Sequence, residues 1–213
     1  MLKNISVYSA SIGNYDQYIQ NTDIIRFSYD RYFATNNRMA AKKFKVLSHQ
    51  YLSSEFSIWI DGNVELVAKP QEFVDMMEDN DVLIFEHPDR SNVFEEAEVI
   101  KTLYLDNPEI VSNQVEFYKE MQYKHSLYSC RLIVRRHNRE IENANNKWWS
   151  EITKWSYRDQ LSFAHAFSDT KIKSIEHPQS YTNDFFVVHP RKIPSKFYQR
   201  IDLLRKRFLS RYD

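Results

Sequence analysis

The stretch Phe56-Ser57-Ile58-Trp59-Ile60-Asp61-Gly62-Asn63 decides the fold, because an apolar run ends there abruptly in an acid, a glycine and an amide. Residues 56–60 predict a buried strand. In open α/β sheets, ligands bind outside the carboxyl ends of the strands. Asp61 and Asn63 are two positions apart, so they can offer oxygen ligands to one divalent cation, Mn²⁺ or Mg²⁺, that also holds a substrate diphosphate.

Glycine is scarce in this chain. Average usage near 7% would give about 15 glycines in a protein of this length, but only Gly13 and Gly62 are present. A chain that avoids glycine elsewhere is expected to need it at these two points, for positive φ or for close approach of the backbone to a ligand. The alternative is that the two positions are incidental.

Composition and charge exclude several classes of protein. Of the 213 residues, 42% are hydrophobic and 27% are charged, as in a globular protein. Lysine plus arginine and aspartate plus glutamate both number 29, so there is no overall basic field for nonspecific binding of nucleic acid. The single cysteine, Cys130, excludes an intrachain disulfide.

The chain also carries no pattern typical of membrane insertion or export. No apolar run approaches the ~20 residues of a membrane helix, and the first residues lead directly into a strand pattern, without a signal peptide. We therefore expect a cytoplasmic protein. Residues 195–211 predict a basic amphipathic helix, which either docks on the domain or makes peripheral contact with an anionic membrane.

Strand and helix patterns alternate along the chain. Strands are expected at 5–10, 23–27, 56–60, 82–85, 132–134 and 185–190, and helices at 36–47, 70–80, 94–105, 108–123, 141–152 and from 156 onward. Residues 48–55 are expected to extend the first helical region, at 36–47. This alternation predicts a single α/β domain over residues 1–213, with helices on both faces of the sheet.

Candidate donor-site residues surround the first two strands and the helix that follows them. Gly13 lies in the loop after the first strand, which carries Ser9, and Asp30 follows the second strand. Such positions commonly meet a nucleotide, although a plain turn and a surface acid are the competing interpretations. Arg38 and Lys42 share one helix face and could reach a diphosphate, or could simply be solvated.

Further polar residues lie after the later strands. Glu86, His87 and Arg90 follow the strand at 82–85 and could line a sugar or acceptor pocket. Trp149 could stack on a sugar ring or pack in the core. Ser156 and Asp159 have the spacing of a helix-capping box, but Asp159 could instead face the site as a base or as a carboxylate that holds a sugar.

His189 ends the last predicted strand and could be a third protein ligand for Mn²⁺. These residues indicate a site that binds a diphosphate through a metal ion. Hydride transfer explains them less well, because it would require a dinucleotide-binding fingerprint.

Several ordered motifs resemble those of one known family. They run in family order over roughly residues 5–167 and are Arg38-Met39-Ala40-Ala41-Lys42, Ser57-Ile58-Trp59-Ile60-Asp61-Gly62-Asn63, His87-Pro88-Asp89-Arg90, Glu95-Glu96-Ala97, Arg135-Arg136-His137-Asn138, Trp148-Trp149-Ser150-Glu151-Ile152 and Arg158-Asp159-Gln160-Leu161-Ser162-Phe163. On these residues the chain resembles the glycosyltransferase-like domain family formerly of unknown function. That family includes the plant turgor-regulation-defect and galacturonosyltransferase-like proteins and bacterial relatives.

The resemblance implies a fold similar to GT-A glycosyltransferases, with a Rossmann-type mixed sheet flanked by helices. It implies that Asp61, Gly62 and Asn63 serve the metal and the donor diphosphate, that Asp159 is the acid at the acceptor-side helix, flanked by Arg158 and Gln160, and that His189 is the C-terminal metal ligand. The second acidic metal ligand of typical GT-A enzymes is an amide here, at Asn63.

The expected activity is therefore a metal-dependent hexosyl- or uronosyltransferase of polysaccharide biosynthesis, which moves a sugar from a UDP-linked donor to a glycan acceptor. Two alternatives stay open from the sequence: a nucleotide- or sugar-binding module without catalysis, and a sugar nucleotidyltransferase. The residues indicate neither the donor sugar, nor the acceptor, nor the oligomeric state.

Overall fold

The computed structural model describes residues 4–12, 23–29, 37–121 and 126–190. The strands are β1 (Ile5–Ile12), β2 (Ile25–Tyr29), β3 (Phe56–Ile60), β4 (Val64–Leu66), β5 (Val82–Glu86), β6 (Tyr128–Arg136), β7 (Ile172–Ile175) and β8 (Phe186–Val188). The helices are α1 (Asn37–Val46), α2 (Pro70–Met76), α3 (Val93–Thr102), α4 (Pro108–Lys119), α5 (Arg139–Lys154) and α6 (Asp159–Ala166), with a 3₁₀ turn, η1, at Ser48–Gln50.

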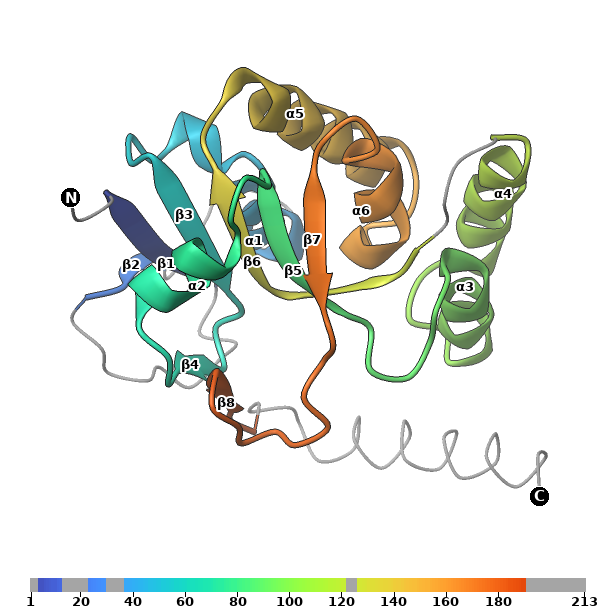
Figure 1. The fold of residues 1–213 in the computed structure, drawn as a ribbon. Coiled ribbons are helices and arrows are strands. Elements are labelled where there is room, and N and C mark those ends of the chain that lie inside the picture. Colours follow the sequence, from blue (N-terminus) through green and yellow to red (C-terminus); the bar gives the residue numbers. More distant parts are fainter. Residues whose placement is uncertain (1–3, 13–22, 30–36, 122–125, 191–213) are drawn as a thin grey trace.

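Six of the strands form one mixed sheet in the order β2-β1-β3-β6-β5-β7 (Figure 1). Strand β6 is antiparallel to both of its neighbours, whereas the other pairs are parallel. Its amino end therefore lies beside the carboxyl ends of β3 and β5. All three ends meet at one edge of the sheet, where polar side chains from distant parts of the sequence come together.

The buried strand β3 supplies core residues to both faces of the sheet. Trp59 belongs to the core beneath α1, α5 and α6, and Ile58 belongs to the core beneath α2 on the opposite face. Because side chains alternate along a strand, Asp61 follows on the Trp59 side. Helices α3 and α4 pack on each other beside α6 (Figure 1).

A second, two-stranded sheet places the last described strand next to the β3–β4 turn. Strands β4 and β8 are antiparallel, with Val64 opposite Val188. The backbone N–H of His189 donates to the Asn63 carbonyl at 2.8 Å. This pairing brings position 189 to the end of the central strand.

The structure confirms the predicted α/β class, with a mixed sheet flanked by helices, and residues 56–60 form the expected buried strand. The strand expected at 132–134 is also confirmed, and it runs further, from Tyr128 to Arg136. The expected helical extension over 48–55 was wrong, since these residues form only the short turn η1. The last helix begins at Asp159, because the Ser156 hydroxyl accepts the N–H of Arg158 and holds a turn outside the helix.

Strands β4 and β7 were not predicted. Both are short, three and four residues, and their Val-Glu-Leu and Ile-Lys-Ser-Ile sequences give too few alternations to identify a strand. The predicted C-terminal helix at 195–211 lies outside the described residues. Among the residues that are described, no helix has both the length and the apolar character needed to cross a membrane.

Candidate functional site

A cluster of four charged side chains occupies the space between α1, the end of β3 and the start of α6. The Asp159 carboxylate lies 3.0 Å from the Lys42 ammonium and 2.6 Å from the Lys45 ammonium. Lys45 also lies 3.7 Å from the Asp61 carboxylate. Lys45 therefore bridges two acids that are almost 100 positions apart in the sequence.

Burial makes these charges depend on one another. The Lys45 side chain is 7% exposed and that of Asp159 is 12% exposed. Burial alone would raise the pKa of the Asp159 carboxyl, but the Lys42 and Lys45 ammonium groups outweigh it and hold that pKa well below its usual range. Burial would likewise lower the pKa of Lys45, but Asp159 and Asp61 outweigh it and raise that pKa.

Lys42 responds differently because it faces only one of the two acids. Burial lowers the pKa of Lys42, and the attraction of Asp159 offsets this effect only in part. Within the four-residue cluster, an ionised Asp159 is thus held between two lysines.

A buried arginine of the central sheet holds the backbone of Lys45. Arg135 of β6 is fully buried and donates to the carbonyls of Lys45, at 2.7 Å, and Val46, at 3.2 Å. Its guanidinium also donates to Asn145 Oδ1 at 2.8 Å and to the Tyr8 hydroxyl. Since these carbonyls are at the carboxyl end of α1, Arg135 caps that helix and complements its dipole.

The turn after β3 fixes Asp61 and Gly62. The indole Nε1 of Trp59 donates to Asp61 Oδ1 at 3.1 Å, and the Asp61 N–H donates to the Arg131 carbonyl at 2.9 Å. The Val64 N–H closes the turn on the Asp61 carbonyl at 2.9 Å, and Gly62 is buried within it. The Asp61 carboxylate therefore has a fixed position beside Lys45.

The structure also brings Asn63 and His189 together. The Asn63 amide Nδ2 donates to the backbone carbonyl of His189 at 2.7 Å. The His189 ring Nε2 lies 2.8 Å from the Glu65 carboxylate. Among the described residues, no three His, Cys, Asp or Glu side chains converge in a way that could hold a metal ion.

The remaining donor-site candidates, and the sugar-pocket candidate Trp149, have different positions. The Arg38 guanidinium lies 4.7 Å from the centre of the Tyr157 ring. Ser9 is buried within β1, at 1% exposure. Trp149 is partly buried and packs against the core of the α1 face, and Trp148, which is fully buried, donates its Nε1 to the Asp159 carbonyl at 3.0 Å. Gly13 and Asp30 lie outside the described residues.

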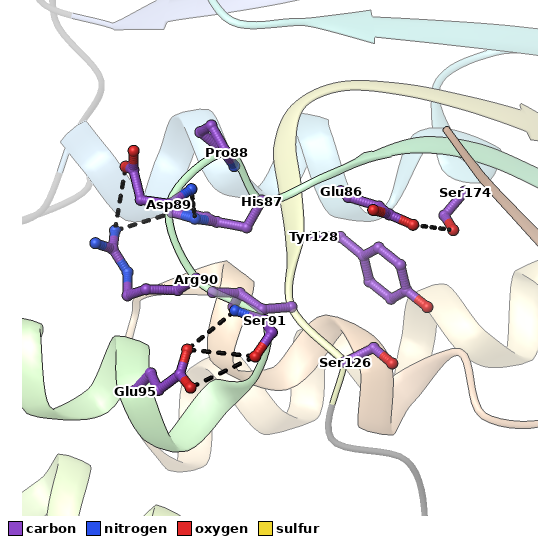
Figure 2. Close-up of a pocket in the computed structure, with 11 residues that line it drawn as sticks. Glu86, His87, Pro88, Asp89, Arg90, Ser91, Glu95, Ser126, Tyr128 and Ser174 are labelled. Carbon is purple, nitrogen blue, oxygen red and sulfur yellow. Dashed lines mark hydrogen bonds and ion pairs between the residues drawn. The ribbon is translucent and has the colours of Figure 1, made fainter. Parts of the chain in front are cut away.

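The candidates at the end of β5 and just after it line a separate cavity of about 580 Å³ at the same edge of the sheet (Figure 2). Glu86 accepts a hydrogen bond from the Ser174 hydroxyl at 3.0 Å. Arg90 lies beside the His87 ring, with 3.3 Å between Nη2 and Nε2. Burial and the Arg90 charge lower the pKa of His87 to about 4, so its ring is neutral at neutral pH.

A short chain of contacts joins this cavity to the charged cluster. The Glu96 carboxylate of α3 is 97% buried at its side chain and lies 2.6 Å from Arg90 Nε and 3.8 Å from Arg158 Nη2. Arg158 immediately precedes Asp159. In addition, Gln160 Nε2 donates to the carbonyl of Tyr128, a cavity residue, at 3.4 Å. Both regions are therefore built on the start of α6.

Sequence reasoning assigned no site role to three residues that the structure places here: Lys45, Glu96 and Tyr128. Lys45 is three positions after Lys42, and such residues are neighbours on a helix, so the spacing carried a usable signal. Glu96 has the usual place of an acid in the first turn of a helix. Its partner Arg90 is only six positions away in the sequence, but its contact with Arg158 depends on packing between α3 and the start of α6 that local sequence does not show.

Comparisons with known proteins agree with the motifs. The family described as TOD1/MUCI70, glycosyltransferase-like domain, matches residues 3–198. Over 144 residues, 61% of the chain, the sequence is 26% identical to the probable hexosyltransferase MUCI70 of Arabidopsis thaliana. The matched segment is 25% of that relative, so the chain spans about a quarter of its length.

One similar solved structure covers nearly the whole chain. It is a glycosyltransferase involved in the glycosylation of the major capsid of PBCV-1, with a TM-score of 0.50 and 10% sequence identity. The similarity covers 95% of this chain and 99% of the other. At this level of identity the comparison shows a shared fold, which is the GT-A-like arrangement that the motifs predicted.

Proposed function

Because the chain belongs to the TOD1/MUCI70 glycosyltransferase-like domain family, as its motifs predicted, we propose that it transfers a sugar from a nucleotide-sugar donor to a glycan acceptor. In this proposal the donor is a UDP-sugar, and Mn²⁺ or Mg²⁺ accompanies its diphosphate. The observation that carries it is the position of Lys45, whose ammonium lies 3.7 Å from Asp61 and 2.6 Å from Asp159. Three distant segments meet there, at the sheet edge where α/β proteins bind ligands.

The lysines suit a leaving group that gains negative charge. When the bond from sugar to diphosphate breaks, charge develops on the diphosphate, and fixed cations stabilise it most strongly where water is excluded. Lys45 is nearly buried and is held by two acids and by the contacts of its helix end. It can therefore meet that charge without a large rearrangement, with Lys42 beside it.

In this proposal the Asp61 carboxylate and the Asn63 amide oxygen would hold the divalent cation. A carboxylate and an amide oxygen are ligands that Mg²⁺ and Mn²⁺ accept, with diphosphate oxygens and water completing the set. His189 would be the third protein ligand, and its contact with Glu65 resembles the carboxylate that usually orients a metal-binding imidazole. The bound cation would neutralise part of the charge on the departing diphosphate.

In this proposal Asp159 acts as a fixed negative charge that orients Lys42, Lys45 and the donor sugar. A carboxylate that accepts contacts from two lysines, at 3.0 and 2.6 Å, is a weak base. Its low pKa leaves little driving force for removing a proton from an acceptor hydroxyl. The cavity that contains Glu86, His87 and Arg90 takes the acceptor, next to Arg158 and Gln160.

Donor turnover tests this proposal. A panel of nucleotide sugars is incubated with the protein and Mn²⁺, and release of the nucleoside diphosphate is measured with and without chelator. We expect release from one UDP-sugar, its loss on chelation, and a fall of at least about 100-fold in Asp61→Ala. Wild-type turnover in Asp61→Ala would contradict the metal and diphosphate assignment.

Two further assays separate the alternatives. Consumption of a sugar phosphate with a nucleoside triphosphate would identify a nucleotidyltransferase. Calorimetry that shows tight binding of UDP, without hydrolysis or transfer over many acceptors, would identify a binding module. Either result would replace glycosyl transfer as the function of this chain.

A further inference from the structure

The cavity at the end of β5 carries an excess of negative charge. Glu86, Asp89 and Glu95 all line it, and Arg90 is its cationic side chain (Figure 2). Arg90 is already paired with the buried Glu96 carboxylate at 2.6 Å, so its charge is largely compensated within the protein. The neighbouring His87 ring, with its pKa of about 4, adds no positive charge at neutral pH.

Two of these three acids remain available at the surface of the cavity. Both oxygens of Glu95 lie within 3.4 Å of the Ser91 hydroxyl, and one accepts the Ser91 N–H at 3.0 Å, so this acid serves to fix the loop. Glu86 is exposed and its Oε1 accepts from Ser174. The Asp89 side chain is 63% exposed and lies 3.9 Å from Arg90. A bound group would therefore meet the carboxylates of Glu86 and Asp89.

The other lining residues suit a polyhydroxylated ring. Figure 2 shows the Tyr128 side chain between Glu86 and Ser126, which gives the cavity an aromatic surface among hydroxyl and carboxylate groups. Apolar faces with a few convergent polar groups are typical of small-molecule sites, and about 580 Å³ falls within their usual size range. A sugar ring presents the matching combination of C–H faces and hydroxyl donors.

We propose that this cavity selects an acceptor sugar that carries no negative charge, either neutral or amino-substituted, and disfavours one that carries a carboxylate or phosphate. The inference rests on the proposed glycosyl transfer for its acceptor role. Its physical cause is repulsion: an anionic sugar would approach Glu86 and Asp89, and among the described residues that line the cavity the cationic side chain, Arg90, is already paired with Glu96. A hydroxyl or ammonium group would instead donate to these carboxylates.

Binding of three matched sugars to the full chain tests this selection without requiring turnover. The probes are the methyl glycosides of glucose, glucosamine and glucuronic acid, and binding is followed by NMR in the presence of UDP and Mn²⁺. We expect the glucoside and the glucosaminide to bind at least about tenfold more tightly than the glucuronide, with a smaller difference at high salt.

The variant Glu86→Gln/Asp89→Asn links the preference to these two carboxylates. Both residues are exposed, so the protein should fold, and the discrimination against the glucuronide should fall several-fold. The control Glu98→Gln removes a charge from the exposed face of α3, where Glu98 pairs with Lys101, and should leave the preference unchanged.

Equal or tighter binding of the glucuronide would overturn the inference, as would an unchanged preference in the double variant or no binding of any of the three sugars. These failures differ from failure of the proposed function, which is tested by turnover of a UDP-sugar. A protein that binds and turns over a UDP-sugar but shows no charge preference keeps the function and loses only the acceptor selection.

Discussion

At the scale of single residues, Asp159 is the group on which the charged cluster depends. It separates the Lys42 and Lys45 ammonium groups, at 3.0 and 2.6 Å, in a largely buried space. We predict that Asp159→Asn destabilises the protein by about 3 kcal/mol, because two cations would lose their buried partner. The control Asp169→Asn changes an exposed acid just beyond the same helix and should stay within about 0.5 kcal/mol of wild type. Chemical denaturation checks both values, and equal stability of the two variants would contradict the role of Asp159.

The same residue leads to a prediction about pH dependence. Because the two lysines hold the pKa of Asp159 well below its usual range, this carboxylate stays ionised down to strongly acidic pH. Its titration should therefore contribute no acid limb to the rate between about pH 5 and 8. The measurement is kcat/KM for donor turnover against pH. An acid limb in that range that is displaced in Lys42→Met would show that Asp159 titrates there and serves as a base.

At the scale of elements, Arg135 connects the central sheet to the end of α1. It donates to the carbonyls of Lys45 and Val46 and to the Asn145 side chain from a fully buried position. We predict that Arg135→Met costs about 3 kcal/mol, because the carbonyls that it satisfies would stay buried without a donor. The exposed Arg139, first residue of α5, gives the matched control Arg139→Met, with an expected change below about 0.5 kcal/mol. Thermal or urea unfolding measures both, and a small effect at Arg135 would show that α1 is held by its apolar contacts alone.

Several elements could be predicted from the sequence because their signals are local. The apolar run from Phe56 to Ile60 and the polar residues after it placed one strand and one edge of the site correctly. The short strands β4 and β7 gave no such signal. The pairing of Lys45 with Asp61 and Asp159 depends on how α1 and α6 pack on the sheet. Charged residues on a helix are usually solvated, so the sequence of α1 alone did not show that Lys45 is buried while other lysines of this helix are more exposed.

At the scale of the whole molecule, two histidines couple the fold to pH. Burial and a nearby arginine, Arg90 for His87 and Arg135 for His137, lower the pKa of each ring to about 4, against 6.5 for an ordinary histidine. Between these values the unfolded chain binds more protons than the folded chain, so stability falls as pH decreases from about 6.5 towards 4. We predict a drop in Tm of roughly 2–4 °C for each ~1 kcal/mol that is lost. Thermal unfolding at a series of pH values measures it, and His87→Gln/His137→Gln should flatten the curve. An equally steep curve in that variant would assign the effect to other groups.

The mixed sheet explains why one edge of the molecule gathers these groups. With β6 antiparallel between β3 and β5, the polar ends of three strands and the start of α6 share one side of the domain. The sequence predicted the α/β class, because strand and helix patterns alternate, but it did not reveal the order of the strands. That order places the Asp61 cluster next to the cavity at Glu86. In our proposal these two adjacent regions are the donor site and the acceptor site.

The most direct test of this proposal is turnover of a UDP-sugar with Mn²⁺ by wild type, Lys45→Met and the control Lys43→Met. Lys43 is exposed on α1, two positions from the buried Lys45. We predict turnover in wild type and in Lys43→Met, and a loss of at least about 100-fold in Lys45→Met, because the diphosphate would lose its fixed cation. Turnover in Lys45→Met that equals the control would contradict the account that the Lys45 cluster is the donor site.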